Sequence, residues 1–155
     1  MSGELEQIEA LLRIKRAREQ RAAASAARAR AAEHRAETAR RAAAQAVADD
    51  ATRRPLLEAE IYARLTGNKV PSTKLQAAAA RLTGMTAYAA VLRQQSVRAD
   101  TEHAASVTAA VTADRTRALQ SREVAAADML RERHMGDAVE GDEEEEGLVG
   151  KNVLF

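Results

Sequence analysis

The side chains that could do chemistry are few and far apart in this sequence. It has three histidines and no cysteine. His34, His103 and His134 are too widely separated to ligate a metal from one helix, although pairing two helices antiparallel would bring His34 within about a turn of His103. Two histidines without a carboxylate or thiolate beside them make a poor metal site. The sequence therefore predicts no metal and no cofactor.

The chain lacks the motifs and the bulk that an enzyme needs. The segment from Thr66 to Lys69 does not match the GxxxxGK[ST] pattern of a phosphate-binding loop. Carboxylates and hydroxyls are numerous, but a thin helical protein cannot bury them enough to shift their pKa values. Nor can it enclose a concave, partly dry site. We therefore expect a protein without catalytic activity.

Cysteine usage and hydropathy indicate a cytoplasmic protein. The absence of cysteine fits a reducing compartment. No apolar run approaches the roughly 20 residues of a membrane-spanning helix, and the N-terminal MSGELEQIEALLRIKR lacks the features of a signal peptide. We expect no direct insertion into a membrane.

Charge is segregated along the chain, although the formal net charge is only +1. Residues 13–41 contain ten basic and three acidic side chains, whereas residues 136–155 contain one basic and seven acidic side chains. The basic stretch is either a solvated helix face or a contact surface for an acidic partner or a nucleic acid. The acidic stretch, with Gly136, Gly141 and the run 143–146, repels itself and is expected to be disordered.

Composition favours helix through the rest of the chain. About a quarter of the residues are Ala, the strongest helix former, and Arg outnumbers Lys about five to one. Large aromatic residues are nearly absent, so a thick globular core is not expected. The predicted fold is all-α, a long antiparallel two-helix coiled-coil hairpin with a disordered acidic C-terminal tail. Its predicted parts are a hairpin over 1–135, with helices at about 4–66 and 72–135 and a turn at 67–71, and the tail over 136–155.

Turn residues mark where the first helix ends and the second begins. Gly67 and Asn68 tolerate the left-handed conformation of a helix C-cap, and Ser72 after Pro71 can act as the N-cap of the next helix. Helices joined by a few residues pack antiparallel. A turn centred near residues 68–70 predicts that facing residues have numbers that sum to about 138.

Pro55 is the expected weak point of the first helix. It cannot donate a backbone hydrogen bond, and it disfavours helical geometry at Arg54. We therefore predict a kink or brief break near residues 52–55.

The heptad pattern predicts that the helices meet along a seam made mostly of alanine, which buries little area per turn. With Ile8 at position a of the first helix, the seam contains Ile8, Lys15, Ala22, Ala29, Ala36 and Ala43 at a, and Leu11, Arg18, Ser25, Ala32, Ala39 and Ala46 at d. In the second helix the repeat starts at Leu75 and becomes unclear after His103, because Arg117 and Arg131 would lie on the seam.

Larger apolar residues gather at the two ends of the predicted hairpin. Near the turn they include both tyrosines, Tyr62 and Tyr88. Each helix has only one neighbour, so a cluster of this size cannot be buried completely. It either locks the hairpin or provides an exposed contact patch. The apolar residues at 148–149 and 153–155 are expected to be an unstructured end rather than a docking motif.

With a basic first helix that opens with LLRIKRAREQRA and an apolar stretch RRPLLEAEIYARLTGNKVPSTKLQ around the turn, the chain resembles the central stalk proteins of bacterial type III secretion systems, the YscO/FliJ type. The resemblance covers roughly residues 5–135 and rests on architecture, length and charge placement. It implies a two-helix coiled coil that inserts into the hexameric secretion ATPase and links it to the export gate. Some members of that family also bind export chaperones.

The resemblance and the residue types together suggest a site at each end of the hairpin. The open end would bind the ATPase through Leu5, Ile8, Leu12, Arg13, Lys15, Arg16, Arg18 and Arg21. The turn end would bind the cytosolic part of the export gate, a membrane protein, through Ile61, Tyr62, Leu65 and Tyr88.

Two other functions fit the residues. A generic cytosolic coiled-coil scaffold would need only the paired helices. A nucleic-acid binder would use the basic stretch 13–41, with an affinity that falls steeply with salt. Interspersed glutamates, the acidic tail and the lack of aromatic residues in the basic stretch argue against nucleic acid as the partner.

Overall fold

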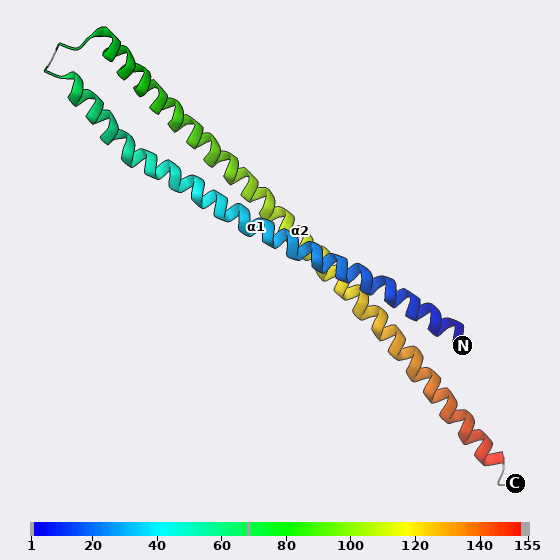
Figure 1. Ribbon diagram of the computed structural model, residues 1–155. Coiled ribbons are helices and arrows are strands. Elements are labelled where there is room, and N and C mark those ends of the chain that lie inside the picture. Colours follow the sequence, from blue (N-terminus) through cyan, green and yellow to red (C-terminus); the bar gives the residue numbers. More distant parts are fainter. Residues whose placement is uncertain (1, 68, 153–155) are drawn as a thin grey trace. The chain divides into compact units, whose positions relative to one another are not determined.

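The computed structural model describes residues 2–67 and 69–152, and side chains within 3–67 and 69–141. This part of the chain contains two helices, α1 over Ser2–Leu65 and α2 over Ser72–Asn152, and no strand. The helices pack against each other as a hairpin (Figure 1), which confirms the predicted all-α fold. No helix in the described residues is long and apolar enough to cross a membrane.

The chain forms two compact units, and each contains a part of both helices. Unit 1 consists of Met1–Ala29 and Ala110–Phe155, and unit 2 consists of Arg30–Ala109. Unit 2 includes the connection between the helices.

In the connection within unit 2, α1 ends in the predicted C-terminal cap, whereas the N-cap of α2 differs from the predicted one. Gly67 has a φ of 88°, the left-handed conformation expected where α1 ends. At the start of α2, the N–H of Leu75 donates to the carbonyl of Pro71 at 3.2 Å. Because the N-cap residue accepts the first intrahelical bond, Pro71 occupies that position and Ser72 is the first helical residue. The prediction of Ser72 as N-cap was therefore wrong by one residue.

Ion pairs within each unit establish the antiparallel register. In unit 1, Lys15 pairs with Glu123 at 3.1 Å and Glu9 with Arg131 at 3.9 Å. In unit 2, the Nε2 atom of His103 lies 3.0 Å from a carboxylate oxygen of Glu37. The residue numbers in these pairs sum to 138, 140 and 140, which confirms the predicted sum of about 138.

The seam of α1 differs from the predicted one. Leu12 and Ala26 are buried, whereas the predicted d residues Leu11, Arg18 and Ser25 are exposed. The predicted a positions, such as Ala22, do face the partner helix. The buried residues that follow the a positions therefore lie one residue later than the predicted d positions. The sequence could not distinguish the two, because an alanine-rich helix presents nearly the same side chain on adjacent faces.

Leu75, the predicted first residue of the α2 seam, is 48% exposed, but beyond it the seam follows the predicted heptad and extends further than expected. Ala89, Leu92 and Ala99 are buried at predicted seam positions, and the same repeat continues to Val124 and Ala127 in unit 1. The predicted loss of the repeat after His103 was therefore wrong. Arg117 is exposed, whereas Arg131 stays half-buried through its ion pair with Glu9.

Two predicted interruptions of helix are not present. α1 runs through Pro55 without a break, because one proline removes only one hydrogen bond of the ladder. A kink at that level stays a prediction. α2 runs past Gly136 and Gly141 to Asn152, where the sequence predicted a disordered tail from residue 136. A single glycine costs a helix only about 1 kcal/mol, and no proline follows. The predicted apolar end at 153–155 lies outside the described residues.

Candidate functional site

The residues predicted to bind an ATPase fall into three structural groups within unit 1. Leu12 is only 2% exposed and belongs to the core between the helices, and Leu5 and Ile8 are half-buried. Lys15 and Arg16 form ion pairs with α2. The remaining three, Arg13, Arg18 and Arg21, are exposed.

The paired cations of this group connect the two helices of unit 1. Lys15 donates to Glu123 at 3.1 Å, and Arg16 donates to Asp128 at 3.0 Å. Ion pairs at a partly exposed position contribute little stability, on the order of 0.2–1 kcal/mol each. They do specify the register, because each joins one residue of α1 to one residue of α2. These two cations are therefore less available to a partner than the sequence suggested.

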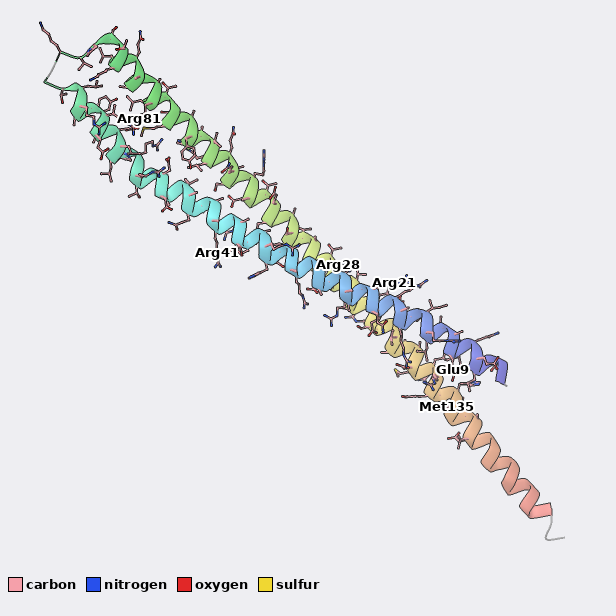
Figure 2. All side chains as sticks on the ribbon, in the orientation of Figure 1. Glu9, Arg21, Arg28, Arg41, Arg81 and Met135 are labelled. Carbon is pink, nitrogen blue, oxygen red and sulfur yellow. The ribbon has the colours of Figure 1, made fainter. Side chains whose placement is uncertain are left out.

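The exposed cations form a surface that faces away from the seam. Arg13, Arg18 and Arg21 make no ion pair with the described residues. At about 100° per residue they cover an arc of about 140° on α1. We call these three residues the basic face. Figure 2 labels Arg21 on α1.

A network around Glu37 neutralises another part of the basic stretch, in unit 2. Arg40 donates two hydrogen bonds to the Glu37 carboxylate at 2.8 and 2.7 Å, and Arg41 donates one at 2.8 Å. His103 of α2 reaches the same carboxylate at 3.0 Å. The hydrogen bonds from Arg40 and then Arg41 lower the pKa of Glu37 to about 2, and Glu37 in turn raises the pKa of Arg40.

His34 and His103 approach each other as the antiparallel register predicted. Both line one surface hollow with Glu37, Arg40 and other charged residues. No cluster of three or more potential metal ligands occurs among the described residues. In this hollow the imidazole of His103 and the Glu37 carboxylate form a link between α1 and α2.

The residues predicted to bind an export gate are divided between core and surface. Ile61 is 6% exposed and packs between the helices, and Leu65 is half-buried. Tyr62 and Tyr88 are 56% and 50% exposed. Large exposed apolar side chains at this end are consistent with a contact surface.

The turn end of unit 2 contains a basic hollow that we call the turn pocket. It has a volume of about 620 Å³, and its charged lining residues are Arg64, Lys69, Lys74 and Arg81. All four are exposed, and none forms an ion pair with the described residues. Ile61, Leu65, Val70 and Pro71 contribute an apolar part of the lining. Arg81 is labelled in Figure 2 near the turn.

Sequence reasoning missed this pocket although the sequence contains a signal for it. Residues 61–99 include six basic side chains and no acidic one. The basic stretch 13–41 has more cations but also three glutamates, and the structure pairs several of its arginines and its lysine. The turn end therefore holds the more uniformly positive surface of the two.

Comparisons with known proteins give no relative for this chain. No family model, no curated protein and no solved structure matches it.

Proposed function

We propose that this protein is a non-enzymatic coupling protein of a bacterial type III secretion system, which links the hexameric secretion ATPase to the export gate and promotes protein export. The main support is that each unit carries an exposed surface that a partner can reach. The basic face lies on unit 1, and exposed tyrosines with the turn pocket lie on unit 2. The resemblance in the sequence supplies the class of partner.

The basic face supports the assignment of the ATPase to unit 1. Its three arginines are exposed and make no ion pair with the described residues, so a partner can reach them without opening the hairpin. Complementary charge mainly speeds association and orients the partner, and it makes binding sensitive to salt. In this proposal Leu12 supports the face from the core, and Lys15 and Arg16 maintain the helix pairing beneath it.

The turn end supports the assignment of the gate to unit 2. Tyr62 and Tyr88 each leave about half of the side chain exposed. Tyrosine supplies a large contact area with a polar end, and it is enriched where proteins bind each other. Export chaperones are a further class of partner that the resemblance implies.

The proposal is tested with a type III secretion ATPase from the same organism. We expect the two proteins to co-elute and ATP hydrolysis to be stimulated. Arg13→Glu/Arg18→Glu should weaken the complex at least about tenfold, because reversed charges repel the acidic partner. The matched control is Arg28→Glu/Arg35→Glu, which reverses two other exposed arginines of α1 and should bind normally.

The readouts separate the coupling protein from the alternatives. Circular dichroism at 222 nm checks that each variant keeps its helices. If the native protein neither co-elutes with the ATPase nor alters hydrolysis, the proposal is wrong and a generic scaffold is the better account. If both pairs of substitutions weakened ATPase binding equally, the basic face would not be the specific contact.

A further inference from the structure

The turn pocket and the acidic stretch of this chain have complementary chemistry. The pocket has four cations and no acidic residue in its lining. Residues 137–146 include seven acidic side chains and no basic one, and Gly147, Leu148 and Val149 follow. We propose that the turn pocket of one copy binds the acidic segment 137–149 of a second copy.

The charges around the turn pocket lack partners within the part of the chain that the structure describes. Arg64, Lys69, Lys74 and Arg81 form no ion pair there. By contrast, Lys15 of unit 1 pairs with Glu123, and Arg16 pairs with Asp128. Four like charges around one hollow repel each other, and bound carboxylates would relieve that repulsion.

The lining favours a polypeptide over a nucleic acid. Ile61, Leu65 and Val70 give the hollow an apolar wall, which suits a polypeptide that contains apolar as well as acidic residues, as the sequence of 137–149 does. Proteins that bind single-stranded nucleic acid normally use aromatic side chains on which the bases stack. Tyr62 and Tyr88 do not line the pocket.

The contact would be heterologous, because a pocket on unit 2 meets a different segment of the neighbouring copy. Such contacts produce closed rings or open chains of molecules. The ion pairs would be exposed, so association should be weak and should be lost as salt screens it. This inference does not depend on the proposed coupling function.

Self-association of the full chain tests the proposal. Sedimentation equilibrium measures the average mass over a concentration series, at about 0.05 M and about 0.5 M salt. We expect the mass to rise with concentration at low salt and to stay at the monomer value at high salt. Lys74→Glu/Arg81→Glu should weaken the association at least about tenfold, because acidic side chains then face the acidic segment.

A charge exchange makes the test specific for the two partners. The tail variant replaces four glutamates with lysine: Glu143→Lys, Glu144→Lys, Glu145→Lys and Glu146→Lys. The pocket variant is Lys74→Glu/Arg81→Glu. We expect neither the pocket variant nor the tail variant to self-associate. Their equimolar mixture should associate, because the acidic segment of the pocket variant fits the native pocket of the tail variant.

A matched variant excludes a general effect of charge. Arg93→Glu/Arg98→Glu makes the same change in net charge on α2, at exposed residues outside the pocket, and should self-associate like the native protein. A monomer at every concentration at low salt would overturn the proposal. So would a mixture that does not associate, or a monomer that instead binds a single-stranded oligonucleotide through Lys74 and Arg81.

Discussion

The ammonium group of Lys15 lies 3.1 Å from the carboxylate of Glu123, and this pair joins α1 to α2 in unit 1. Their side chains are only 21% and 37% exposed. Lys15 therefore pairs the two helices, a structural role that the sequence analysis did not predict. A substitution at Lys15 would change helix pairing and partner binding together, so Arg13 and Arg18 are the better probes of an ATPase contact.

A double-mutant cycle measures the Lys15 pair. Lys15→Gln and Glu123→Gln should each lower the free energy of unfolding by about 0.2–1 kcal/mol. The double variant should be less destabilised than the sum of the two, because the interaction is lost only once. Urea unfolding followed by circular dichroism provides the values. Strict additivity would mean that the pair contributes nothing to stability.

Leu12 should be far more important for stability than its neighbour Leu11. Leu12 is 2% exposed, whereas Leu11 is 40% exposed. Leu12→Ala should cost about 2–3 kcal/mol, near the lower end for a core leucine because a two-helix core can partly collapse. Leu11→Ala should cost less than about 1 kcal/mol. Equal costs in urea unfolding would contradict the seam that the structure shows.

The position of the alanine seam can be tested by adding bulk. Ala26 is 1% exposed, and Ala27 beside it is exposed. Ala26→Leu should destabilise the hairpin by about 1–3 kcal/mol, because the larger side chain forces the helices apart. Ala27→Leu should change stability by less than about 0.5 kcal/mol. Thermal unfolding of both variants measures the two effects. If Ala27→Leu were the more destabilising of the two, the seam would lie on the face of Ala27 instead.

Two glycines should respond to alanine with opposite signs. Gly67 has a φ of 88°, and alanine there should cost about 1 kcal/mol, because a Cβ atom disfavours left-handed backbone. Gly84 lies inside α2 with open space around it, so Gly84→Ala should stabilise the protein by about 0.5–1 kcal/mol. Chemical unfolding of the two variants measures both signs. Stabilisation by Gly67→Ala would contradict the cap.

The carboxylate of Glu37 should make stability depend on pH in the acid range. Its folded-state pKa is about 2, below the ordinary value of 4.5. A lowered pKa means that the contribution is complete above pH 4.5 and is lost as the pH falls toward 2. The native protein should therefore melt at a higher temperature than the Glu37→Gln variant at about pH 6, and the difference should shrink as the pH falls through that window.

The arginines beside Glu37 provide the control for that titration. Arg40 and Arg41 supply the hydrogen bonds that lower the pKa of Glu37. In an Arg40→Gln/Arg41→Gln background, the effect of Glu37→Gln on the melting temperature should depend much less on pH over the same range. An unchanged pH dependence would assign the effect to other carboxylates.

Much of the fold could be predicted from local chemistry. Alanine and arginine favour helix, and Gly67 provides the left-handed backbone that ends α1, so the two helices and the turn between them follow from nearby residues. A short connection then makes the helices antiparallel, and the position of the turn determines the register. The Glu37 and His103 pair lies where that register predicts. The continuation of α2 past Gly136 differs from the prediction, because a run of like charges does not by itself end a helix that is already formed.

By itself, the sequence determined two helices, their direction and the level at which they face each other. Only the tertiary structure decided which face of α1 is buried, because alanine on neighbouring faces gives no hydrophobic contrast. It also decided which cations are paired. Lys15 and Arg16 meet carboxylates on α2, whereas Lys74 and Arg81 line a hollow without ion pairs to the described residues. Ion pairing depends on distances between residues remote in sequence, and such distances exist only once the two helices have packed.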